Sequence, residues 1–251
     1  LVEPMPDSPH VNTHPMLVQS AAEAFRRLDA REVLVAEGPG HCRDTHLVLE
    51  QSGFESMLTE SRLPFVDTNY DEVFSTPNLG GRTTLGRLFL PRSLKRADLV
   101  VSLPKMKTHH WTGVTLSMKN LFGLIPGSVY GWPKNVLHWA GIHRSIVDIT
   151  ATVQPHLAIV DGIVGMEGDG PIMGRPKPAQ VMVIGTNLPA VDATAARLMG
   201  FSPKRIPYLM AASGWLGPIR AGNIEQRGEE ITGLVQRFDL VSHPATARFR
   251  P

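Results

Sequence analysis

The sequence is poor in cysteine and in aromatic residues. Among its 251 residues there is one cysteine, Cys42, and 6% are Phe, Trp or Tyr. A lone cysteine cannot form an internal disulfide, and by itself it cannot hold an iron–sulfur cluster or a structural zinc ion. We therefore expect no disulfide framework and no iron–sulfur cluster. The low cysteine content fits a reducing compartment, so the expected location is cytoplasmic.

Long runs of like residues are also missing. The 25 basic and 23 acidic residues are spread along the chain, and the net charge is +2. Because no basic run has the length of a nucleic-acid or membrane patch, we expect neither partner. No apolar run approaches the roughly 18 residues that cross a bilayer, and no signal-peptide pattern opens the chain. The first residue is Leu1 rather than methionine, so we expect a truncated N-terminus.

What the sequence does contain is an alternation of apolar strand and helix patterns. At 42% hydrophobic content it predicts one globular domain over residues 1–251. The patterns predict helices from Thr13 or His14 to near Leu28, and over 44–53, 136–153 and 189–200, and strands over 32–38, 97–107, 156–168 and 179–187. This order favours an α/β fold with a mixed or parallel sheet and flanking helices, with room for two lobes around a cleft.

Polar segments follow three of the predicted strands. In open α/β sheets ligands bind beyond the carboxyl ends of the strands, so "GPGHCRDTH", "KMKTHHWTG" and "DGIVGMEGDGPIMG" are expected to converge on one cleft. The first segment is either a plain turn or a phosphate cradle. Its His41, Cys42 and His46 are either surface residues or metal ligands.

The third segment carries the carboxylates Asp161, Glu167 and Asp169 among glycines. One interpretation is a wide surface turn. The other is a loop at the site, whose carboxylates orient histidines, bind substrate or hold a hard cation such as Mg²⁺.

The most reactive groups lie in "KTHHWTGVTLSMKNLFGLIPG", residues 107–127. A histidine such as His109 suits proton transfer near neutral pH, and a lysine desolvated among apolar neighbours, as predicted for Lys119, has a depressed pKa suited to covalent chemistry. Lys105 and Lys107 alternate along a strand and should face one side, where they would attract a carboxylate or phosphate. The competing interpretation is structural, with Lys119 and Asn120 anchoring a helix start and His109 bonded in the core.

A longer stretch, "LPKMKTHHWTGVTLSMKNLFGLIPG", resembles the signature of the domain of unknown function family 362 (DUF362). Further matches follow in that family's order: "VDGIVGMEGDGP" (160–171), "AVDATAARLMG" (190–200) and "IPYLMAASGWLG" (206–217). The resemblance covers residues 11–240. Some members of the family carry an added ferredoxin-type cluster domain, and because Cys42 is the one cysteine here we expect that module to be absent.

The same stretch is more distantly similar to the nickel-pincer lactate racemases, in which a histidine precedes a lysine by ten positions and an "LPG"-like turn follows. This resemblance implies that His109 is a general acid and base, that Lys119 carries a nickel-pincer nucleotide cofactor, and that His138 ligates nickel. From the residues alone, His138 is by default a core histidine. On one continuous helix His143 would lie about 140° away from it, so the two would not form a ligand pair.

Together these observations predict an enzyme, isomerase-like or racemase-like, that acts on a small anionic metabolite by proton transfer. His109 and Lys119 would be catalytic, and the substrate would contact Lys105, Lys107, Asn120, Asp161, Glu167 and Asp169. Two alternatives remain: a non-catalytic module that binds and carries an anion or cofactor, and a Mg²⁺-dependent phosphoryl-transfer or hydrolytic enzyme. We also expect the side chains of His109, Lys119 and His138 to open into one cleft walled by "DGIVGMEGDGP".

Overall fold

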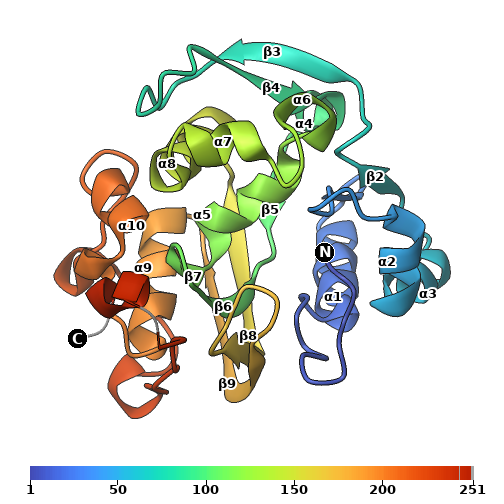
Figure 1. Ribbon diagram of the computed structural model, residues 1–251. Coiled ribbons are helices and arrows are strands. Elements are labelled where there is room, and N and C mark those ends of the chain that lie inside the picture. The colour runs from blue at the N-terminus through green and yellow to red at the C-terminus, as the bar shows by residue number, and fades with distance from the viewer. Residues whose placement is uncertain (243, 250–251) are drawn as a thin grey trace.

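A five-stranded mixed sheet forms the centre of the computed structural model, which describes residues 1–242 and 244–249 (Figure 1). Its strands are β5 (Val101–Ser102), β6 (Lys105–His109), β7 (Gly113–Thr115), β8 (Leu157–Glu167) and β9 (Arg175–Gly185). The long strand β8 pairs in parallel with β5 and β6 and antiparallel with β9, while β7 pairs antiparallel with β6. The predicted α/β class and mixed sheet are therefore confirmed.

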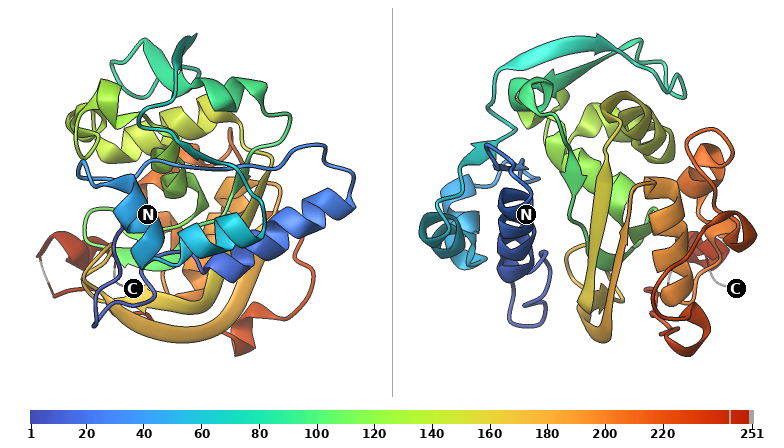
Figure 2. Two further views of the ribbon diagram at one scale, coloured as in Figure 1. Left: turned by 90° about the vertical axis from the view of Figure 1, so that its right-hand side faces the viewer. Right: turned by 180° about the vertical axis from the view of Figure 1, so that it is seen from behind.

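Helices cover the two faces of this sheet (Figures 1 and 2). On one side lie α1 (Pro15–Arg27), α2 (Thr45–Gln51) and α3 (Phe54–Glu60), and on the other lie α9 (Leu188–Leu198) and α10 (Pro207–Ala212). Pro15 suits the first turn of α1, where its missing N–H leaves no bond unmade. The helices predicted from Thr13 or His14 to near Leu28, over 44–53 and over 189–200 are confirmed within a few residues.

The buried apolar side chains form two separate clusters. The smaller one joins α1, α2 and α3 and packs beneath the two-stranded parallel sheet of β1 (Val35–Glu37) and β2 (Phe65–Asp67). The larger one lies among the central sheet, α9, α10 and α8 (Ile142–Val153). The residues discussed below lie where the elements of these two clusters meet.

A hairpin and several short helices complete the fold. The hairpin pairs β3 (Val73–Pro77) with β4 (Arg87–Pro91), and its tip is held by the buried carboxylate of Asp148, which accepts hydrogen bonds from the backbone of Arg82 and Thr83. The short helices are α4 (Arg92–Arg96), α5 (Ser117–Asn120), η1 (Leu121–Leu124), α6 (Gly127–Tyr130), α7 (Asn135–Trp139), η2 (Pro203–Arg205), η3 (Ala221–Asn223), η4 (Ile231–Gly233) and η5 (Pro244–Phe249).

The strand predicted over 97–107 is two strands. β5 ends at Ser102, and residues 105–109 form β6, because they pair with β8 on one side and β7 on the other. The strands predicted over 156–168 and 179–187 are confirmed as β8 and β9, so Asp161 and Glu167 lie on a strand and not in a surface turn. The strand expected over 32–38 is reduced to Val35–Glu37.

The helix predicted over 136–153 is two helices. Gly141 has φ of 102°, a conformation that favours glycine, and it separates α7 from α8. His138 therefore lies on α7 and His143 on α8. The angle of 140° expected between them on one helix is wrong, since they do not share a helix.

Candidate functional site

Three lysines from separate elements converge between the two clusters. Lys107 lies on β6 and donates to the carbonyl of Val11 at 3.0 Å. Lys119 lies on α5, its Nζ 3.9 Å from the centre of the Phe122 ring. Lys134, just before α7, donates to Oδ1 of Asn69 at 2.5 Å. We call Lys107, Lys119 and Lys134 the lysine cluster.

Burial depresses the pKa values of all three lysines, and two of them depress that of the third. Burial, followed by repulsion from Lys107 and Lys134, lowers the pKa of Lys119 to about 7. Burial lowers the pKa of Lys107 to about 8, with a further contribution from Lys105, and burial also lowers the pKa of Lys134 to about 8. Charged ammonium groups that raise one another's energy in this way favour an anion between them.

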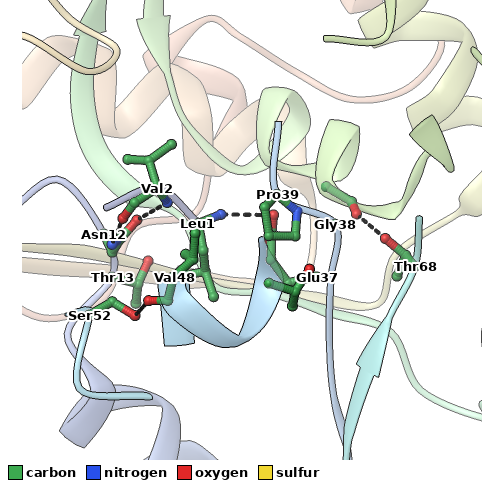
Figure 3. A network of polar contacts seen from close by, with 12 residues as sticks. Leu1, Val2, Asn12, Thr13, Glu37, Gly38, Pro39, Val48, Ser52 and Thr68 are labelled. Atoms are coloured by element: carbon green, nitrogen blue, oxygen red, sulfur yellow. Dashed lines mark hydrogen bonds and ion pairs between the residues drawn. The ribbon is translucent and has the colours of Figure 1, made fainter. Parts of the chain in front are cut away.

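Glu37 is a carboxylate that faces all three lysines. It ends β1, and its attraction raises the pKa of each lysine of the cluster against the larger effect of burial. Its Oε1 lies 2.9 Å from the amino group of Leu1, toward which Figure 3 shows it pointing. Gly123 leaves room for the Glu37 carboxylate, because a Cβ at position 123 would lie 2.6 Å from Oε2 of Glu37. Asp67 also raises the pKa of Lys134. Two carboxylates therefore face the three lysines, which leaves an excess of positive charge while all three lysines are protonated.

His109 closes β6 beside the cluster as a neutral imidazole. Only 5% of the residue is exposed, and its Nδ1 accepts the backbone N–H of Trp111 at 3.0 Å. Burial and then the charge of Lys119 hold the pKa of His109 well below its ordinary value. Since Nδ1 is an acceptor, the proton of the neutral ring is on Nε2. His109 is thus a hydrogen-bond donor at Nε2 and a weak base.

His138 joins the same region through ring contacts. Its Nδ1 bonds to the carbonyl of Lys134 at 3.0 Å, so the proton lies on Nδ1 and Nε2 is unprotonated. Its ring stands edge-on to those of Trp111 and Phe122, with centroids 5.4 and 5.9 Å away. Trp111 in turn lies 6.3 Å from His109, and Phe122 contacts Lys119. The structure therefore places His109, Lys119 and His138 around one set of aromatic rings.

The position of Lys119 is fixed by a carboxylate from α9. Asp192, fully buried, accepts the backbone N–H groups of Ser117 and Met118 at 2.7 and 3.1 Å. It also accepts the hydroxyls of Ser117 and Tyr208 at 2.5 and 3.3 Å. These contacts satisfy the free donors at the start of α5. Burial raises the pKa of Asp192 to about 6 despite the hydrogen bonds.

Lys105, expected to contact substrate, is engaged inside the protein. Its Nζ lies 2.5 Å from Oδ2 of Asp161 and 3.0 Å from the carbonyl of Val164. Asp161 also accepts the backbone N–H of His14 at 2.9 Å. The pair joins β6 to β8 and to the segment that leads into α1, an arrangement that favours a structural role for both residues.

The other predicted contact residues have partners of their own. Glu167 bonds to Arg175 at 3.0 Å and lies 3.3 Å from Lys177, and Asn120 donates to Oγ of Ser102 at 3.2 Å. Asp169 is exposed, 3.9 Å from Nδ1 of His110. The backbone carbonyl of Gly170 accepts from the N–H of His110, so this segment lies beside the end of β6. A common cleft of His109, Lys119 and His138 walled by this segment stays a prediction.

Metal ligation finds little support in this arrangement. In the described ranges, 1–242 and 244–249, no group of three His, Cys, Asp or Glu side chains could hold a metal ion. His41, Cys42 and His46 are exposed, and Asp161 and Glu167 are each paired with a cation. His138, the one nickel ligand that the racemase resemblance implies, lies beside the Phe122 ring that Lys119 contacts. The nickel-pincer cofactor stays a prediction.

Sequence patterns pointed to Lys107, Lys119, His109 and His138 but missed Glu37, Lys134 and Asp192. Glu37 ends a buried strand, a position that could have indicated it. Asp192 is a carboxylate inside the otherwise apolar "AVDATAARL", which also marks it as unusual. Lys134 lies in a short connection between α6 and α7, and no local pattern distinguishes it.

Comparison with known proteins supplies the family. Part of the chain is similar to a thylakoid-associated protein of Synechocystis sp., with 29% identity over 180 residues, covering 68% of this chain and 52% of the relative. The chain thus spans about half the length of that curated relative. In the part of the chain that the structure describes, no helix is long and apolar enough to cross a membrane. Residues 1–197 match the domain of unknown function DUF362, and the chain therefore belongs to that family.

Proposed function

We propose that this protein binds a small anionic metabolite in the lysine cluster and transfers a proton to and from it. The observation that carries the proposal is the convergence of Lys107, Lys119 and Lys134 beside the neutral imidazole of His109. A carboxylate or phosphate bound there would offset the mutual repulsion of the lysines, which no neutral ligand would do.

The pKa values divide the roles among these residues. Lys107 and Lys134, with pKa values of about 8, are mostly charged at neutral pH and would hold the anion. Lys119, with a pKa of about 7, would accept a proton from the substrate and return it, since both of its forms are populated at that pH. Nε2–H of His109 would donate to the oxygen on which charge develops. This assigns the acid and base role to Lys119, because His109 is too weak a base.

Exchange of carbon-bound hydrogen in D₂O tests the proposal even while the product is unidentified. The protein is incubated with a panel of 2-hydroxy and 2-oxo carboxylates and phosphorylated sugars, and loss of proton NMR signals is followed. We expect exchange in at least one compound, its loss in Lys119→Met, and a reduced rate in His109→Gln. Lys204→Met, which removes an exposed lysine elsewhere, is the matched control. Exchange at the wild-type rate in folded Lys119→Met would overturn the assignment.

A non-catalytic anion or cofactor carrier is the second candidate. The low pKa of His109 favours it, because a carrier needs no histidine base. Intact-mass and metal analysis of protein purified from its native host separates the two. A small molecule released on denaturation, without hydrogen exchange by the wild type, supports the carrier, whereas hydrogen exchange supports the enzyme. A covalent adduct on Lys119 would support covalent enzymology in place of the base role of its free amine. The racemase-like cofactor and the cytoplasmic location stay predictions.

A further inference from the structure

An open groove adjoins the lysine cluster on its outer side. It has a volume of about 570 Å³ and runs between the turn after β6 and the junction of α7 with α8. The side chains that give it its chemical character are Trp111, His138, Trp139, His143, Arg144 and Arg248. The rest of its lining consists of small or aliphatic residues at the junction of the two helices.

Two tryptophans leave large apolar surfaces uncovered in this groove. Trp139 is 80% exposed and Trp111 is 50% exposed. Exposed indole rings on a concave surface are suited to stacking on a planar ring of a ligand. The aromatic content of the whole chain is 6%, so two such rings at one place are a concentrated feature.

The charged groups of the groove are basic. Arg144 and Arg248 are exposed, and Arg248 is oriented by a hydrogen bond of 3.0 Å to the carbonyl of Trp111. No carboxylate of residues 1–242 or 244–249 lines the groove. Nδ1 of His143 is buried without a hydrogen-bond partner among the described residues. Guanidinium groups pair well with phosphate, and an unsatisfied ring nitrogen can accept or donate one more bond.

Two side chains of the groove lie next to residues that adjoin the lysine cluster. Trp111 and His138 line the groove, and their rings lie 5.4 Å apart. On their inner side, Trp111 lies 6.3 Å from His109, and His138 lies 5.9 Å from Phe122, the ring that Lys119 contacts. The groove therefore lies next to the lysine cluster, with the rings of Trp111 and His138 between them.

We propose that the groove binds the aromatic part of a phosphorylated ligand, of the class of nucleoside monophosphates. The base stacks on Trp139 and Trp111, and the phosphate is held by Arg144 and Arg248 at the entrance to the lysine cluster. This inference rests on the proposed function for the inner anion site, and it adds the class of molecule that occupies the outer one.

Calorimetric titration at pH 6.5 tests whether the groove binds a nucleoside monophosphate. The three probes are AMP, ribose 5-phosphate and inorganic phosphate, and ribose 5-phosphate lacks the base. Since stacking of one base contributes about 1–3 kcal/mol, we expect AMP to bind about tenfold tighter than ribose 5-phosphate or more. Trp139→Ala should remove this difference and leave ribose 5-phosphate binding unchanged. Arg144→Gln should weaken AMP and ribose 5-phosphate alike. Trp215→Ala and Arg227→Gln alter exposed residues elsewhere and serve as matched controls.

The outcomes separate this inference from the proposed function. The inference is overturned if AMP binds no tighter than ribose 5-phosphate, or if AMP binding is unchanged in Trp139→Ala. If ribose 5-phosphate still binds and Lys119→Met weakens that binding, the lysine cluster remains supported. If the wild type binds none of the three probes, the inference fails, while hydrogen exchange in the carboxylates still decides the proposed function. Loss of the AMP advantage in Trp139→Ala, with the controls unchanged, supports the groove as an aromatic site.

Discussion

Lys105 and Asp161 form a buried ion pair, with 2.5 Å between Nζ and Oδ2 and side chains that are 3% and 1% exposed. Removal of one partner leaves the other as an uncompensated charge in the interior. We therefore expect Lys105→Met to lower the free energy of unfolding by about 3–5 kcal/mol, measured by urea denaturation at pH 7.

The double variant Lys105→Met/Asp161→Asn is the control for this prediction. Asparagine keeps an acceptor for the N–H of His14, which Asp161 binds at 2.9 Å, and it carries no charge. Its stability should return to within about 1–2 kcal/mol of the wild type. A double variant as unstable as Lys105→Met would show that lost packing, rather than the unpaired charge, causes the effect.

Anion binding should weaken as the pH rises. The site attracts an anion while its lysines are protonated, and their pKa values are about 7 for Lys119 and about 8 for Lys107 and Lys134. Binding should therefore be strongest below pH 7 and fall about tenfold or more by pH 9. Sulfate is the suitable probe, because it does not titrate in this range. Equal sulfate affinity at pH 6.5 and 9 would contradict the assigned site.

Lys119→Met should make the protein more stable at pH 6. The folded-state pKa of Lys119, about 7, lies below its value in the unfolded chain, so the folded state is penalised while the amine is charged. The penalty is complete below pH 7 and disappears as the pH rises toward the ordinary lysine value of about 10.4. We expect a gain on the order of 2 kcal/mol at pH 6 that shrinks by pH 9.5. Lys204→Met should show no such dependence. A stability difference for Lys119→Met that stays constant with pH would show that the buried charge is not its cause.

Asp192 should be more important for stability than a surface carboxylate. Asp192→Ala leaves two backbone N–H groups at the start of α5 and two hydroxyls without their acceptor. We expect Asp192→Ala to lower the free energy of unfolding by about 3 kcal/mol or more, as measured by chemical denaturation at pH 7. Asp192→Asn keeps an acceptor oxygen and should lose less. Equal stability of the two variants would mean that the acceptor is not what matters.

The sequence predicted the parts of the fold that depend on local patterns. Strand β8 and helix α9 have long apolar periodicity and ends marked by Pro and Gly, and both are present. The sequence predicted one strand over 97–107, but it could not show that this strand divides into β5 and β6 or that β6 continues to His109, because both depend on pairing with β7 and β8. The hairpin of β3 and β4 was missed for the same reason: its polar sequence is held by Asp148, 65 residues away from Thr83.

The residue types of the candidate site were predictable from the sequence, but their protonation states were not. His109 and Lys119 have the residue types that proton transfer requires, and the structure brings them together. Their protonation could not be read from the sequence, since the low pKa of His109 depends on burial and on the neighbouring Lys119. Lys105 looked equivalent to Lys107 by its spacing, and only the position of Asp161 on β8 distinguishes the two.

The anchoring of α5 by Asp192 sets the order in which the site can form during synthesis. The two residues joined by this contact, Ser117 and Asp192, are 75 positions apart in the chain. At about 5–20 residues per second, Lys119 leaves the ribosome several seconds before the carboxylate that positions its helix. A nascent chain that ends before α9 therefore holds the lysines of the cluster without the geometry that lowers their pKa values, and anion binding should begin only when that helix has been made and packed.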